Sequence, residues 1–132
     1  MHPERPKPIS IDTAFESLRF LPDRTPASDD ERWFNTLSNY RDGGIFVAHY
    51  AGTSQWERHR AGDEIVMVVD GTTTLILFID GEEFPNTMTA NEFLVVPHGV
   101  WHRFETPDGV KVMSVTPQPT DHRTDRPPDH ES

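Results

Sequence analysis

Cysteine is absent from the 132 residues, so the chain has no disulfides and no thiolate metal ligands, which excludes the commonest structural zinc sites. Long apolar runs are also absent, and the N-terminus lacks the apolar core of a signal peptide. Basic residues are few: 12 Lys and Arg stand against 22 Asp and Glu, a net charge of −10. This charge argues against nucleic acid and membranes as partners. These absences predict a soluble, cytoplasmic protein.

The length predicts one domain with two polar ends. We expect an N-terminal extension over residues 1–40, a β-barrel over residues 41–116 and a disordered tail over residues 117–132. The tail is predicted from its lack of apolar side chains, because such a segment cannot bury enough surface to become ordered.

The N-terminal extension shows two possible short helices. Apolar residues at helical spacing, Ile11, Phe15 and Leu18, predict a helix over residues 13–19 behind an Asp12 cap, packed on the barrel. The segment between the two, Phe20 to Pro26, is expected to be a turn. A second helix is predicted over residues 29–37, with a strand through residues 37–40 as the alternative.

In the rest of the chain, turn residues separate short apolar segments at the spacing typical of a β protein. Turn signals at Asp70-Gly71, Asp80-Gly81 and residues 106–109 separate short apolar segments. The predicted strands are residues 45–50, 64–69, 72–79, 82–88, 93–96, 102–105 and 110–116. About seven short strands of this kind favour an all-β, double-sheet jelly-roll fold.

One stretch, Gly52 to Gly71, gathers residues that can bind a metal. Glu57 and His59 are two residues apart, so in an extended segment their side chains point the same way. Glu64 then begins an apolar strand and shares a face with Val66. A carboxylate buried there needs a partner, and a cation also bound by His59 would be one.

This stretch and a second one, residues 97–102, resemble the two motifs of the cupin superfamily. The first motif is Gly, a spacer, His-x-His, a Glu and a Gly, and the second is Gly, a spacer and Pro-x-Gly-x-x-His. The corresponding residues are Gly52, Glu57-Arg58-His59, Glu64 and Gly71 for the first motif, and Asn91, in place of its opening Gly, and Pro97-His98-Gly99-Val100-Trp101-His102 for the second. The resemblance covers residues 41–116 and implies a cupin barrel, a double-stranded β-helix, with His59, Glu64 and His102 as metal ligands.

The remaining ligand position holds Glu57 where the family has histidine, which leaves three roles open. As a ligand, Glu57 completes a site of two histidines and two carboxylates, which suits Mn, Fe, Ni or Co better than structural zinc. As a non-ligand, it leaves the two-histidine, one-carboxylate pattern of non-haem iron oxygenases and is a candidate general base. The third possibility is an exposed ion pair with Arg58 or Arg60.

The resemblance implies a divalent transition metal (Fe, Mn, Ni, Co or Zn) and a small organic substrate or ligand in the barrel. A dioxygenase-like oxidoreductase is favoured, with an isomerase, a decarboxylase or a non-catalytic sensor cupin as alternatives. His49 is a second catalytic candidate if its strand face is interior, and an outward histidine if it is not. The family resemblance also implies a homodimer.

Overall fold

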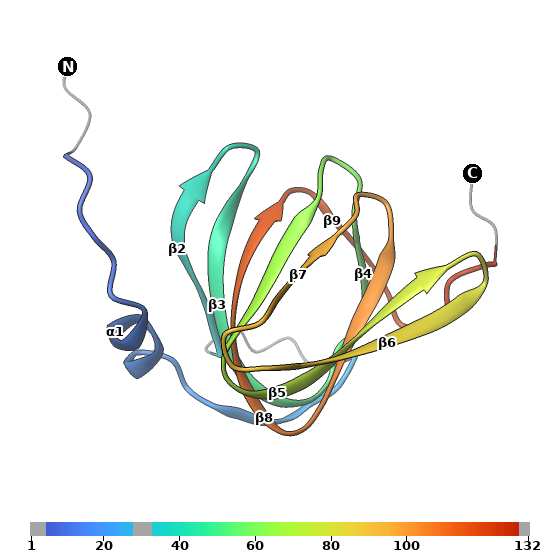
Figure 1. Ribbon diagram of the computed structural model, residues 1–132, viewed down its shortest axis with the longest axis horizontal. Helices are drawn as coiled ribbons and strands as arrows, with labels where there is room; N and C mark the ends of the chain where they lie inside the picture. Colours follow the sequence, from blue (N-terminus) through green and yellow to red (C-terminus); the bar gives the residue numbers. More distant parts are fainter. Residues whose placement is uncertain (1–4, 28–32, 130–132) are drawn as a thin grey trace.

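The computed structural model describes residues 5–27 and 33–129, and strands dominate it. The elements in chain order are α1 (Ile11–Glu16), β1 (Leu21–Arg24), β2 (Phe34–Tyr40), β3 (Gly43–Thr53), β4 (Trp56–His59), β5 (Glu64–Ile79), β6 (Glu82–Thr89), β7 (Phe93–Val96), β8 (Trp101–Pro117) and β9 (Thr120–Arg123). The strands curve around a common interior, with α1 outside them (Figure 1). The predicted all-β architecture is confirmed. Within the described ranges, no helix has the length and apolar character needed to cross a membrane.

Two long antiparallel strands, β5 and β8, form the frame of the sheet. β8 also pairs with β3, while β6 and β7 pair with β5 (Figure 1). The register between β5 and β8 shifts near Gly71, where a Cβ atom would lie 2.4 Å from the Gly109 carbonyl oxygen. Both glycines have positive φ angles, +82° and +111°, which are strained for other residues.

The turns predicted at Asp70-Gly71 and at residues 106–109 are therefore wrong, because each strand passes through its glycine as an irregularity of the ladder. The Asp80-Gly81 hairpin between β5 and β6 is confirmed. Both of its residues have positive φ, as a type I′ turn requires.

The inner face of β5 alternates as the sequence predicts. Glu64, Val66 and Val68 are buried, whereas Ile65 between them is 40% exposed. The valines belong to an apolar core that also contains Tyr50, Leu75, Met88, Val96, Phe104, Val110 and Val112. This core lies directly beside the buried Glu64 carboxylate, so the strand carries the acid into an apolar environment.

The N-terminal region differs in part from the prediction. Helix α1 covers Ile11–Glu16 and begins at a Ser10 cap, whose hydroxyl accepts a hydrogen bond from Thr13 N at 3.2 Å. It therefore begins and ends earlier than the predicted 13–19. The expected turn over residues 20–26 is instead largely strand β1, which pairs in parallel with β3.

The second predicted helix, over residues 29–37, is wrong where the structure describes it. Phe34–Tyr40 forms β2, which pairs with β3 through residues 43–48, so the strand alternative is the correct one. Residues 28–32 lie outside the described ranges. Pairing with β3 therefore determines the structure of residues 34–40, as tertiary context often overrides local propensity.

The prediction that residues 117–132 are disordered is wrong for residues 120–123, which form strand β9. Thr120–Arg123 pairs with β4 from Trp56 to His59, and Asp121 forms ion pairs with Arg58 and Arg60 at 3.1 and 2.8 Å. Backbone pairing and charge hold this segment in place of apolar burial. The division into an extension over 1–40 and a barrel over 41–116 stays a prediction.

Candidate metal centre

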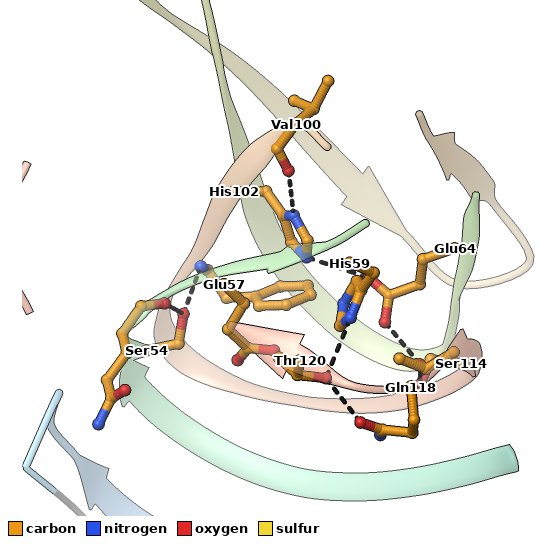
Figure 2. Close-up of polar contacts among 12 residues, drawn as sticks. Ser54, Glu57, His59, Glu64, Val100, His102, Ser114, Gln118 and Thr120 are labelled. Carbon is orange, nitrogen blue, oxygen red and sulfur yellow. Dashed lines mark hydrogen bonds and ion pairs between the residues drawn. The ribbon is translucent and has the colours of Figure 1, made fainter. Parts of the chain in front are cut away.

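Four side chains predicted as ligands come together from three strands (Figure 2). Glu57 and His59 lie on β4, Glu64 begins β5, and His102 lies near the start of β8. Glu57 is paired in register with His102. His102 is 0%, His59 2% and Glu64 5% exposed, so the sheet carries three polar groups into its interior.

The reactive atoms of these side chains are close to one another. His102 Nε2 lies 3.0 Å and His59 Nε2 lies 3.4 Å from Glu64 Oε1. Glu57, His59 and His102 each offer one ligand atom, and these three atoms lie within 4.8 Å of one another. The spacing is that of groups which can share one ion.

Three of these atoms have no hydrogen bond of acceptable geometry, despite the short separations. They are His59 Nε2, Glu64 Oε1 and His102 Nε2, all shielded from solvent. A buried polar atom without a partner costs about 1–3 kcal/mol, so three in one place need an explanation. A cation between them would bind all three lone pairs, and imidazole with carboxylate is an ordinary ligand set for divalent transition metals. The residues present therefore fit a metal ion.

The other atoms of the same side chains are held by hydrogen bonds (Figure 2). His102 Nδ1 lies 3.0 Å from the Val100 carbonyl oxygen, which can only accept, so Nδ1 carries the hydrogen. Thr116 Oγ1 donates to Glu64 Oε2 at 2.6 Å. These contacts orient His102 Nε2 and Glu64 Oε1 toward the centre, as outer partners of metal ligands do.

Thr120 orients His59 in the same way. Its hydroxyl hydrogen is directed to Gln118 Oε1 at 3.1 Å, so its oxygen accepts from His59 Nδ1 at 3.0 Å. His59 Nδ1 therefore carries a hydrogen, and Nε2 faces the centre, 3.4 Å from Glu64 Oε1. The residue comes from β9, in the segment that the sequence predicted to be disordered.

We expect Thr120→Val to weaken metal binding by about 10- to 100-fold, the usual effect of losing an outer partner. Valine keeps the shape but accepts no hydrogen bond, so the His59 ring loses its fixed tautomer. Metal titration of the variant would measure the loss. Thr124→Val, an exposed threonine of the same segment, is the matched control and should bind as the wild type does. Equal affinity in both variants would contradict the positioning role.

Charge coupling shifts the protonation of the buried acid and its partner. Burial raises the pKa of Glu64, but the facing imidazoles of His102 and His59 outweigh this and lower it to about 2. Burial lowers the pKa of His102, but Glu64 outweighs that effect and raises it above its ordinary 6.5. In the absence of a metal, a proton on His102 is the cation that stabilises Glu64.

A bell-shaped stability profile is expected for the metal-free protein. The lowered pKa of Glu64 contributes stability above its ordinary 4.5, which is lost as pH falls toward 2. The raised pKa of His102 contributes stability below 6.5, which is lost as pH rises through its folded value. The free energy of unfolding should therefore be highest between pH 4.5 and 6.5, as urea titrations would show. A profile that rises steadily through pH 8 would contradict this coupling.

Glu57 is held differently from the ion pair suggested by the sequence. Its carboxylate lies 3.6 Å from an Arg24 guanidinium nitrogen and is 19% exposed, whereas Arg58 and Arg60 both pair with Asp121. The third possibility for Glu57, an exposed ion pair with Arg58 or Arg60, is therefore wrong. Glu57 faces the two histidines from the more open side of the cluster, which is compatible with a ligand or with a base.

His49 does not join the cluster, so the expectation that it contacts substrate is wrong. Its ring lies against Phe20 with centroids 4.7 Å apart, and it is paired in register with Lys111. Its neighbours Ala48 and Tyr50 line the interior cavity, whereas His49 does not. His49 itself lies outside the cavity lining, against Phe20, which corresponds to the alternative that it points outward.

A cavity of about 590 Å³ leads to the cluster, a size that suits a small organic molecule. It is lined by Arg24, Thr25, Pro26, Trp33, Phe34, Phe46, Val47, Ala48, Tyr50, Gln55, Glu57, His59, Glu64, Val66, Phe104, Val112, Ser114, Thr116, Gln118, Pro119, Thr120 and His122. Arg24, Thr120 and His122 were missed by the sequence analysis. No local pattern marks them, because each reaches the cavity through strand pairing with a distant segment.

Comparison with known proteins gives one family and many similar folds. The family model described as "Cupin domain" matches residues 45–116, and no curated protein matches the chain at a significant level. A cupin-2 domain protein from Shewanella frigidimarina has 20% identity and a TM-score of 0.61, covering 87% of this chain and 94% of that one. A protein from Neisseria meningitidis has 16% identity and a TM-score of 0.61, covering 85% and 100%. Hydroquinone 1,2-dioxygenase from Sphingomonas, solved with 4-hydroxybenzoate bound, has 16% identity and a TM-score of 0.56, covering 75% and 71%.

Proposed function

The chain belongs to the cupin family, and from that membership we propose that it is a metal-dependent enzyme acting on a small organic substrate in the barrel. Glu57, His59, Glu64 and His102 are the proposed metal ligands. The observation that carries the proposal is the convergence of three buried atoms without hydrogen bonds at the end of a cavity. A metal ion would bind all three atoms at once, whereas a proton on His102 serves only the pair that it forms with Glu64.

The donor set favours some metals over others. Two imidazoles with one or two carboxylates match Fe, Mn, Ni and Co better than structural zinc, whose closed sites are built mainly from cysteine and histidine. The number of protein ligands depends on whether Glu57 binds the metal. With it, the site has four protein ligands; without it, His59, Glu64 and His102 form the two-histidine, one-carboxylate set of non-haem iron oxygenases.

A dioxygenase-like oxidoreductase is the reaction class that we propose. When bound, the metal would supply a Lewis acid and open positions for oxygen and substrate. The chain's own residues bind and orient the substrate through the apolar walls, which also exclude water. Glu57, at the side of the cluster, is positioned to remove a proton from a substrate hydroxyl or enol if it is not a ligand.

Two measurements test this function. Elemental analysis of protein purified without a tag should find one equivalent of a divalent transition metal. Oxygen consumption by the iron-loaded protein should then be seen with at least one member of a panel of β-diketones, enols and catechols. Metal without oxygen consumption, but with conversion of a substrate, would favour an isomerase or decarboxylase. Metal with no turnover at all would favour a sensor that binds a small ligand.

We also propose that the protein is a homodimer. Ile65, Phe93 and Val95 are 40%, 65% and 46% exposed and lie on the neighbouring strands β5 and β7, where Ile65 is paired with Val95. This exposed apolar patch supports the proposal, because a second copy of the chain would cover it. Sedimentation of the wild type should give twice the chain mass, and Phe93→Glu should shift it to the monomer. A monomeric wild type would contradict the dimer.

A further inference from the structure

Arg24 enters the cavity from a strand that the sequence did not predict. Strand β1 pairs in parallel with β3, and Arg24 lies opposite Gly52. The approach is close, since a Cβ at Gly52 would come within 2.1 Å of the Arg24 carbonyl oxygen. Gln55 donates a side-chain hydrogen bond to the Pro26 carbonyl at 2.5 Å, which ties the end of this segment to the chain just before β4. The backbone that carries Arg24 is therefore held on two sides.

The Arg24 guanidinium is also held in place, by two aromatic rings. Its central carbon lies 4.4 Å from the centre of the Trp33 ring and 4.5 Å from that of Tyr50, so two aromatic rings fix the group. Trp33 Nε1 and the Tyr50 hydroxyl are buried without a hydrogen bond of acceptable geometry. Trp33 and Tyr50 line the cavity beside Arg24, so an indole N–H and a phenol O–H accompany the guanidinium there, and both can donate to the acceptor oxygens of a ligand.

The contact with Glu57 leaves the guanidinium able to bind a second acceptor. At 3.6 Å, the two groups attract each other but are too far apart for a hydrogen bond. An arginine presents five N–H donors in a planar fork, which matches a carboxylate in two parallel hydrogen bonds. Glu57 in turn lies near the histidines, so one carboxylate group separates the fork from the proposed metal centre.

The charges of the cavity also favour an anion. Among its described lining residues, Arg24 is the single Lys or Arg, and Glu57 and Glu64 are the acids. A bound divalent ion would neutralise the two negative charges of Glu57 and Glu64, which leaves the cavity with the single positive charge of Arg24. A ligand with one negative charge brings the total to zero, whereas a phosphate with a charge near −2 would make it negative.

We propose that Arg24 holds the carboxylate of a small organic acid whose reacting end reaches the His59, Glu64 and His102 cluster. The inference rests on the proposed function, because the excess positive charge exists only with a bound metal. It deepens that function by naming the substrate class as monocarboxylates that fit the cavity of about 590 Å³. Arg24 is then the residue that determines specificity.

Calorimetric titration of the nickel-loaded full chain with matched pairs tests this assignment. The probes are benzoate with benzamide and pyruvate with pyruvamide, and inorganic phosphate is a further anion. At least one carboxylate should bind about 10- to 100-fold more tightly than its amide, the effect of a charge-assisted hydrogen-bonded pair. Arg24→Gln should remove this preference and leave amide binding unchanged. Arg126→Gln is the matched control, since Arg126 is outside the cavity lining, pairs with Asp129 and should retain the full preference.

Each outcome decides the proposal. Equal affinity for carboxylate and amide in the wild type overturns it, as does tighter binding of phosphate than of both carboxylates. A preference that persists in Arg24→Gln also overturns it. If Arg24→Gln fails to fold, Arg24→Lys keeps the charge without the fork and should lower the preference about tenfold. Nickel content of the same samples separates the two claims, because a wild type that binds no metal refutes the proposed function directly.

Discussion

His102→Ala is expected to purify without metal and to bind added metal more than about 100-fold more weakly than the wild type, since losing an outer partner alone costs up to that much. His102 is 0% exposed, and its Nε2 lies 3.0 Å from Glu64 Oε1. Alanine leaves a space in place of the proposed ligand and cannot take part in coordination. Elemental analysis and a competitive metal titration would measure the loss.

His98→Ala is the matched control, because it removes a histidine from the same short stretch. The His98 side chain is 70% exposed and pairs with Asp63 at 3.3 Å, and His98 is not a member of the candidate ligand set. This variant should keep its metal. Glu57→Ala then decides the open role: loss of metal makes Glu57 a ligand, whereas retained metal with reduced turnover makes it the base. Full retention in both His102→Ala and Glu57→Ala would refute the site.

Gly52→Ala is expected to lower the free energy of unfolding by about 2–5 kcal/mol. Gly52 has a φ angle of +114°, which an alanine adopts only with strain. The added Cβ would also come within 2.1 Å of the Arg24 carbonyl oxygen and 2.6 Å of the Arg24 nitrogen. These are backbone atoms, so β1 itself must move. Urea denaturation would measure the change as a lower midpoint with an unaltered slope.

Gly62→Ala provides the comparison within the same stretch. A Cβ there would meet only Pro117 side-chain atoms at 3.7 Å or more, which is ordinary contact. Its stability should stay within about 0.5 kcal/mol of the wild type. A Gly52→Ala protein as stable as Gly62→Ala would contradict the close pairing of β1 with β3. That pairing also supports Arg24, so carboxylate binding should fall in Gly52→Ala.

The inner face of β5 illustrates what could be predicted from residue types. Glu64, Val66 and Val68 alternate with Ile65, and this period of two sets the buried face without reference to any other strand. The same applies to Glu57 and His59 on β4. The Asp80-Gly81 turn is equally local, because its two positive φ angles follow from the residues themselves.

Strand continuity could not be predicted in this way. Asp70-Gly71 reads as a turn, yet β5 continues through it because Gly71 lies against Gly109 of β8. The absence of a side chain at Gly71 lets the two strands approach at Gly109, and neither glycine's local sequence indicates that the two lie together. The side of β3 that faces inward was undetermined for a related reason: alternation separates His49 from Tyr50 but does not say which of the two faces is the core.

Local chemistry was therefore enough to identify the β class and the residue types able to hold a metal, because alternation, turn geometry and ligand type are properties of short segments. The tertiary structure alone decided that β1 brings Arg24 and β9 brings Thr120 to the same cavity. Such pairings are made by backbone hydrogen bonds, which every residue except proline can form, so the side chains of β1 and β9 carry little record of their partners. The distance along the chain between Thr120 and His59 is closed only when the sheet forms.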